Sequence, residues 1–171
     1  KEADASPENF SFQKSLGTAL YRYGTMKKDT AIIDEAVRLL DRANKLDHKD
    51  YQTTVGLGYA KCGTGWFRKD MPAMLRAREL YETALAQKPE DADVRSDLAL
   101  TYYLYEPSDL DRAIAEFQAA LKTNPKHERA LQYLTETYVK KGNWTEAQKT
   151  ADRLKQINPG NPALSDLFKQ I

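Results

Sequence analysis

The residue types that most often do chemistry are scarce in this chain of 171 residues. It has two histidines, His48 and His127, and one cysteine, Cys62. Both histidines fall at predicted turns, and neither has a Cys, Asp or Glu at metal-ligand spacing on a helix face. A single cysteine excludes an internal disulfide and a multi-cysteine metal site. We therefore expect no metal and no cofactor, with structural or solvent-exposed roles for both histidines.

Two further features that could belong to an active site have simpler interpretations. The segment from Gly56 to Gly58 reads Gly-Leu-Gly, but it interrupts a helical pattern and does not follow a strand, as a phosphate-binding loop would. Close packing of helices explains these glycines better. Cys62 lies near the end of a predicted helix, where a buried, inert thiol is the common case. The sequence therefore predicts a protein that is not an enzyme.

Composition excludes several other classes of function. Charged residues make up 30% of the chain, but the net charge is only +1, so no overall field favours nucleic acid or an anionic membrane. The apolar runs are a few residues long, far short of the roughly 20 that span a bilayer. Residues 1–9 carry charge, a proline and no apolar run, which predicts a flexible tail rather than a signal peptide. Cytoplasmic and exported locations are equally open, and the chain could be one module of a longer protein.

Internal repeats are the strongest signal in the sequence. Small and apolar residues recur 41 positions apart in the first half of the chain. The matched pairs are Leu16 and Leu57, Gly17 and Gly58, Ala36 and Ala77, Ala43 and Ala84, and His48 and Pro89. The series continues with shorter spacing, since Ala77 is followed by Ala113 after 36 residues and by Ala147 after 34 more. The chain is therefore expected to be an array of similar units.

Each unit divides into two helical patterns. Apolar residues recur at a spacing of three and four, as in Ile114, Phe117 and Leu121. Prolines at 89, 125 and 159 follow the second pattern and cannot continue its helix. The predicted units cover residues 10–50, 51–91, 92–127 and 128–161, and residues 162–171 form a short amphipathic helix that covers the last hairpin.

These residues resemble the tetratricopeptide repeat family, in which 34-residue helical hairpins carry conserved small and aromatic positions. The resemblance is clearest in residues 128–161, and it covers roughly residues 10–161. The matching residues there are Leu134, Tyr138, Gly142, Trp144, Ala147 and Pro159. The resemblance implies an all-α fold, a right-handed solenoid of about four antiparallel hairpins with a C-terminal capping helix. Alanines such as Ala113 and Ala147 would let the two helices of a hairpin approach closely.

The first two units depart from the family pattern because each is seven residues longer, 41 against 34. Seven residues could add about one turn to each helix or form a protruding loop. For Gly63 to Asp70 we expect a loop, since two glycines close together disfavour a helix. Trp66 and Phe67 would then lie on that loop.

The family resemblance also implies a binding surface, because the first helix of each hairpin lines the concave side of such a stack. An extended or helical segment of another protein would bind there. One tyrosine per unit recurs among the candidates, and tyrosine offers large contact area with few rotatable bonds. Aligning each unit on its leucine gives the partner-binding candidates: Lys14, Thr18, Tyr21, Arg22, Gln52, Tyr59, Asp93, Ser96, Asp97, Tyr103, Arg129, Gln132, Tyr133 and Glu136.

One subtype of the family is disfavoured by these positions. Cochaperones of this family grip a C-terminal carboxylate with lysine, asparagine and arginine at fixed groove positions. Here only Lys14 fits, and Thr18, Gly56, Asp93 and Asp97 occupy the others. Two acids in place of two bases would repel a carboxylate. The sequence thus predicts a scaffold that binds some other peptide or protein. The alternative is a self-association module, a homodimer through the solenoid ends or the segment 63–70.

Overall fold

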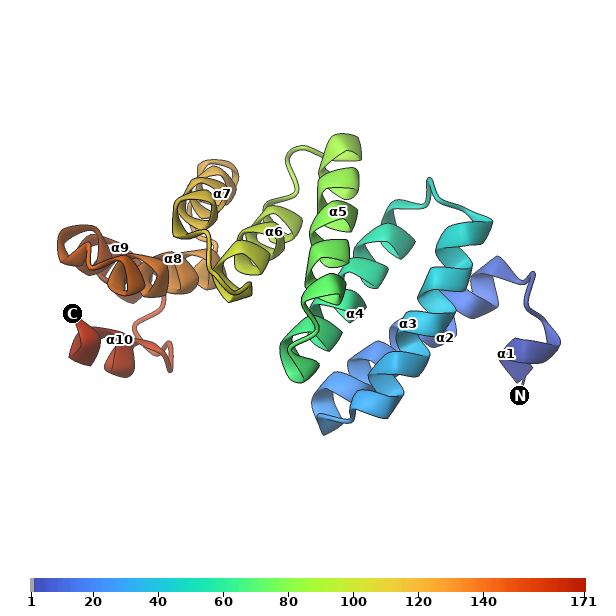
Figure 1. The fold of residues 1–171 in the computed structure, drawn as a ribbon. Coiled ribbons are helices and arrows are strands. Elements are labelled where there is room, and N and C mark those ends of the chain that lie inside the picture. The colour runs from blue at the N-terminus through green and yellow to red at the C-terminus, as the bar shows by residue number, and fades with distance from the viewer. Residues whose placement is uncertain (1) are drawn as a thin grey trace. The chain divides into compact units, whose positions relative to one another are not determined.

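The computed structural model describes residues 2–171, and side chains from Asp4 onward (Figure 1). In this part of the chain every regular element is a helix. The helices are α1 (Glu2–Ala5), α2 (Phe10–Lys27), α3 (Thr30–Leu46), α4 (Tyr51–Arg68), α5 (Met71–Gln87), α6 (Ala92–Leu104), α7 (Leu110–Thr123), α8 (Glu128–Lys141), α9 (Trp144–Ile157) and α10 (Leu164–Gln170). The all-α class with antiparallel hairpins and a short C-terminal helix, predicted from the sequence, is confirmed.

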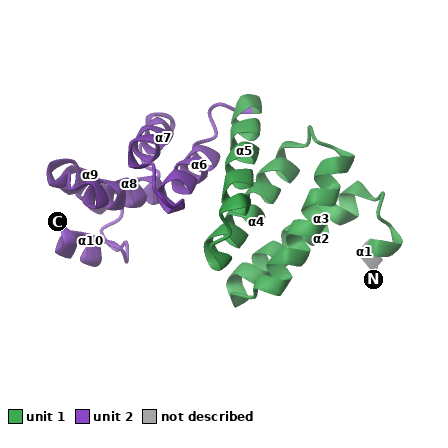
Figure 2. Cartoon of the chain, viewed as in Figure 1, with its two compact units in different colours: residues 1–87 green, residues 88–171 purple. Residues whose placement is uncertain are grey.

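The chain divides into two compact units (Figure 2). Unit 1 ends at Gln87 and contains the hairpins α2–α3 and α4–α5, with α3 packed against α4. Leu40, Leu57, Ala60 and Leu80 lie at the centre of its core. Unit 2 comprises residues 88–171 and contains the hairpins α6–α7 and α8–α9, with α7 packed against α8. Each unit therefore buries the apolar faces of four principal helices.

Helix starts in unit 1 repeat with the same 41-residue spacing as the core. Asn9 and Asp50 cap α2 and α4, and each side chain accepts a hydrogen bond from the backbone N–H three residues later. Asp29 and Asp70 do the same for α3 and α5. Such caps satisfy backbone donors that an isolated helix start leaves unpaired. The two long hairpins are therefore built on one local pattern.

The extra residues of the long units extend the helices, and the loop expected from Gly63 to Asp70 is wrong. Helix α4 continues to Arg68, and Lys69 ends it with a positive φ of 55°. The glycines serve packing instead. A Cβ added to Gly65 would lie 3.1 Å from the backbone N of Met74 on α5, so glycine lets the two helices approach closely. Trp66 and Phe67 consequently lie on the last turn of α4, with exposed fractions of 56% and 39%.

Unit 2 is completed by α10, which packs against α8 and α9. Leu164 and Leu167 are buried on its inner side. The turn before α10 is fixed by Glu128 at the start of α8, whose carboxylate accepts hydrogen bonds from the side-chain amides of Asn158 and Asn161 at 2.8 and 3.3 Å. This contact holds α10 beside the first helix of the last hairpin, which matters for the site described below.

Residues before α2 also make defined contacts. Within the segment predicted to be a tail, Glu2–Ala5 form one helical turn, and Asp4 pairs with Arg38 of α3 at 2.7 Å. Gln13 of α2, fully buried, donates from its side-chain amide to the carbonyl of Ser6 at 3.0 Å. The mobility of residues 1–9 stays a prediction.

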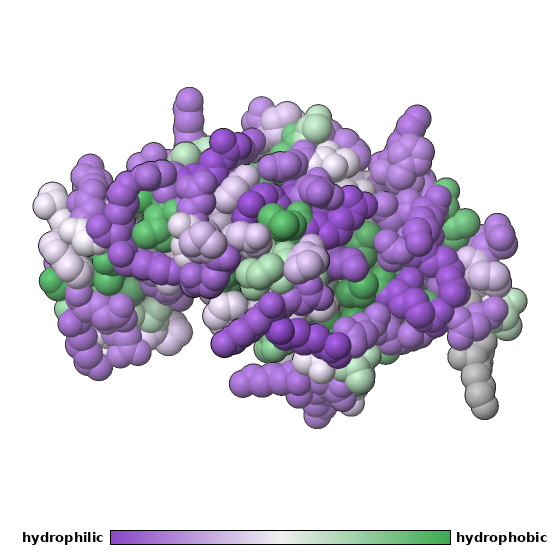
Figure 3. Space-filling view, in the orientation of Figure 1, coloured by the Kyte–Doolittle hydropathy of each residue, from purple (hydrophilic) through white to green (hydrophobic). Residues whose placement is uncertain are grey.

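The surface agrees with the composition. On the face shown in Figure 3, hydrophobic side chains form small separate patches in a mostly hydrophilic surface. Over residues 2–171, no helix has both the length and the apolar character needed to cross a bilayer.

Candidate functional site

The tyrosine candidates of unit 1 pack against one another. The rings of Tyr21 and Tyr59 stack with centroids 6.5 Å apart, and Tyr59 contacts the buried Tyr81 at 5.9 Å. Both Tyr21 and Tyr59 are half-buried. Their stacked rings join α2 to α4.

The polar candidates of unit 1 lie at the surface of α2 and α4. Thr18, Arg22 and Gln52 are exposed. The ammonium group of Lys14 is already held by both carboxylate oxygens of Asp50, at 2.8 and 3.0 Å. Partial burial raises the pKa of Asp50, but the hydrogen bonds from Lys14 and Thr53 together outweigh it and keep that pKa below its usual value. Lys14 is thus committed to joining the first hairpin to the second.

Several candidates of unit 2 serve the packing of α6 on α8. Ser96 and Asp97 are buried, and Asp97 forms an ion pair with Arg129. Asp93 lies 2.9 Å from Nε2 of His127, whose Nδ1 accepts the N–H of Ala130 and caps α8. His127 therefore has the structural role expected of it.

Tyr133 connects the core of unit 2 to its surface. Its ring stacks on the fully buried Phe117, with centroids 6.3 Å apart and planes 10° apart. On its other side it meets Tyr103 at 6.0 Å. The position of Tyr103 is therefore set by an aromatic column that starts in the core.

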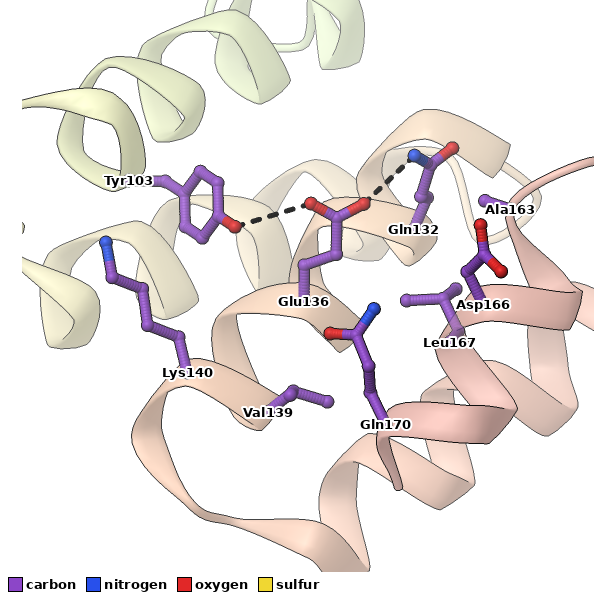
Figure 4. Close-up of a pocket in the computed structure, with 9 residues that line it drawn as sticks. All are labelled: Tyr103, Gln132, Glu136, Val139, Lys140, Ala163, Asp166, Leu167 and Gln170. Atoms are coloured by element: carbon purple, nitrogen blue, oxygen red, sulfur yellow. Dashed lines mark hydrogen bonds between the residues drawn. The ribbon is translucent and has the colours of Figure 1, made fainter.

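Three of the candidates, Tyr103, Gln132 and Glu136, meet residues of α10 around a pocket of about 600 Å³ (Figure 4). We call it the α10 pocket. Helix α6 supplies Tyr103, and one face of α8 supplies the residues from Gln132 to Lys140. The segment leading into α10 and α10 itself form the opposite wall. Its lining residues are Tyr103, Gln132, Glu136, Val139, Lys140, Ala163, Asp166, Leu167 and Gln170.

The carboxylate of Glu136 is the polar centre of the α10 pocket. It accepts hydrogen bonds from the Tyr103 hydroxyl at 3.4 Å and from the Gln132 amide at 3.0 Å (Figure 4). Burial, together with the neighbouring Glu136 charge, raises the pKa of Tyr103 to about 12. The hydroxyl is therefore protonated near neutral pH and serves as a donor. The arrangement can orient a polar ligand group, and its neutral donors suit binding better than proton transfer.

Comparison with known proteins agrees with the repeat pattern. The tetratricopeptide repeat family model matches residues 104–171. The tetratricopeptide repeat protein 21 homolog of Caenorhabditis elegans is 32% identical over an alignment of 142 residues, and the match covers 75% of this chain. The chain is thus similar to proteins of the tetratricopeptide repeat family. It spans only 11% of the length of that relative.

Solved structures show the same tetratricopeptide repeat fold. A crystal structure of MamA has a TM-score of 0.74 at 23% identity and covers 92% of this chain and 77% of its own. MamA from Desulfovibrio magneticus gives 0.75 at 19% identity, with coverages of 94% and 81%. A thermophilic tetratricopeptide repeat protein of Thermus thermophilus gives 0.69 at 19% identity, with coverages of 90% and 81%. At these identities the likeness concerns the fold.

The α10 side of the pocket was missed from the sequence. The sequence predicts a capping helix at residues 162–171 with the apolar residues Leu164, Leu167, Phe168 and Ile171. In the structure Leu164 and Leu167 are buried, and Phe168 and Ile171 are half-buried. The same pattern places Asp166 and Gln170, four residues apart, on one face of that helix. This polar face is the feature of the sequence from which the α10 wall of the pocket could have been predicted. Within residues 2–171, no group of three or more His, Cys, Asp or Glu side chains could hold a metal ion.

Proposed function

We propose that this chain is a non-enzymatic scaffold that binds a peptide or protein segment on the row of first helices, and that the segment docks in the α10 pocket. One observation carries the proposal: groove candidates from α6 and α8 line a pocket of about 600 Å³ together with α10. That volume suits one or two side chains of a ligand. Apolar walls beside a few fixed polar groups are typical of binding sites.

Peptide selection tests the proposal. A library of random 12-residue peptides is selected on the immobilised chain, and the Kd of each selected peptide is measured by fluorescence anisotropy. Val139→Trp fills the α10 pocket from α8 and should weaken binding by about tenfold or more, because the larger side chain occupies the space that an anchoring ligand side chain needs. The matched control Gln148→Trp adds the same side chain at an exposed position of α9 and should leave the Kd within about twofold. Equal affinities of the two variants would refute docking in the pocket.

Self-association is a second candidate, favoured by the exposure of Trp66 and Phe67 on α4. Two neighbouring exposed aromatic side chains form an apolar surface patch, and such patches are typical of protein–protein interaction sites. If copies of the chain pair there, sedimentation equilibrium should detect a dimer that the double variant Trp66→Ala, Phe67→Ala abolishes. If the wild type and the double variant are both monomers at concentrations up to about 0.1 mM, the Kd of any dimer lies above the range of stable dimers. Self-association would then be refuted.

A further inference from the structure

We infer that the segment bound in the α10 pocket presents a lysine or arginine, whose cationic group pairs with Glu136. This inference rests on the proposed docking in that pocket and adds the chemical class of the ligand. Its basis is a carboxylate inside a pocket, held in place by the protein and not neutralised by it.

The first step is the pairing of Glu136. One oxygen accepts from the Tyr103 hydroxyl and the other from the Gln132 amide, and both donors are neutral. In the part of the chain that the structure describes, no lysine, arginine or histidine forms an ion pair with this carboxylate. An ionised carboxylate has about four acceptor sites. Two of them therefore remain for a ligand.

The second step is the charge of the whole pocket. Its ionisable side chains, besides tyrosine, are Glu136, Asp166 and Lys140. The Lys140 ammonium donates to the Ser108 hydroxyl at 2.7 Å, lies 3.7 Å from the carboxylate of Glu106 and 5.2 Å from the Tyr103 ring centre. Figure 4 shows it directed at the Tyr103 ring, away from the carboxylate of Glu136. Lys140 is thus occupied at the rim. Asp166 already pairs with Lys169 at 3.1 Å, so the charge that favours a cation in the pocket is that of Glu136.

The third step is the shape of the walls. Val139, Ala163 and Leu167 give the pocket an apolar side next to the carboxylate (Figure 4). Lysine and arginine carry an aliphatic stem that packs on such surface while the charged end reaches a polar partner. The amide of Gln170 can accept a further hydrogen bond from a guanidinium group, which has five donors. A basic side chain therefore satisfies the apolar wall and the carboxylate together, whereas an acidic one would be repelled.

The test uses the peptides selected from the random library. We expect nearly every peptide that loses binding to Val139→Trp to contain a lysine or arginine. Replacing that residue by norleucine or citrulline should weaken binding to the wild-type chain about 10–100-fold, as expected for one charge-assisted contact. Glu136→Gln keeps the shape of the side chain and should weaken the basic peptide to the same extent. Asp152→Asn on α9 removes an exposed acid outside the pocket and serves as the control.

The outcomes separate the two proposals. If a peptide loses affinity for Val139→Trp but keeps its affinity after the norleucine substitution and for Glu136→Gln, the inference of a cationic ligand is wrong and the docking site stands. If no selected peptide loses affinity for Val139→Trp, both proposals are wrong. The norleucine and citrulline peptides are measured on the unchanged chain, so a folding defect in Glu136→Gln cannot produce the expected result.

Discussion

Phe117→Ala is expected to lower the free energy of unfolding by about 3–5 kcal/mol, the largest effect of any single change considered for this protein. Phe117 of α7 is fully buried, and its ring stacks on Tyr133 of α8. Alanine would leave a cavity that the neighbouring helices can only partly fill, and the lost transfer free energy adds to the cavity cost. Unit 2 should unfold first.

Urea unfolding followed by circular dichroism measures this effect. The matched control is Phe67→Ala, which removes the same ring from the exposed last turn of α4 and should change stability by less than about 1 kcal/mol. Because Tyr133 joins Phe117 to Tyr103, the variant should also weaken peptide binding under conditions where it remains folded. If Phe117→Ala lowered peptide affinity no more than Phe67→Ala does, the aromatic column would not support the α10 pocket.

Much of the fold follows from the sequence, because its determinants are local. Ala113 and Ala147, identified as small residues at helix crossings, are both completely buried. Helices α7 and α9 each end two residues before a proline, Pro125 and Pro159, as the geometry of proline requires. Hairpins with a regular 3.6-residue pattern and proline stops can be recognised without tertiary information.

The loop expected at Gly63 to Asp70 failed for a physical reason. Glycine lowers helix propensity, but it also lets two helices come close, and sequence alone does not show which effect applies. The repeat could have decided it. Gly24 lies 41 residues before Gly65 and makes the same close approach, 3.1 Å from its Cβ position to the backbone N of Ile33 on α3. A glycine that recurs at the repeat spacing belongs to the packing of a helix.

The candidate site was predictable only in part. Helix register grouped Tyr103, Gln132 and Glu136 as candidates, and in the structure these three side chains line the α10 pocket. It also selected Ser96 and Asp97, which the structure buries against α8. Register gives the direction of a side chain, but the distance to the next helix decides whether that side chain is covered. For α10 that distance depends on the contact of Glu128 with the preceding turn.

Gly58→Ala and Gly56→Ala should change stability in opposite directions, although both lie in α4. A Cβ at Gly58 would lie 2.7 Å from Cε1 of Tyr81, a ring that is 1% exposed and has no room to move. Overpacking of this kind costs about 1–3 kcal/mol. A Cβ at Gly56 would meet Leu40 at 3.7 Å, an ordinary contact, so the helix gains up to about 1 kcal/mol from the better propensity of alanine.

The two midpoints of urea unfolding, measured at equal m-values, should therefore fall on either side of the wild-type midpoint. The pair separates the two roles of glycine, since propensity alone predicts stabilisation at both positions. Stabilisation by Gly58→Ala would show that Tyr81 yields easily and that α4 and α5 are not held at close distance by the missing side chain. Destabilisation there, with stabilisation at Gly56, would establish that the recurring glycines at 17 and 58 set the helix spacing in both long hairpins, because Gly17 makes the equivalent 2.8 Å approach to Leu40.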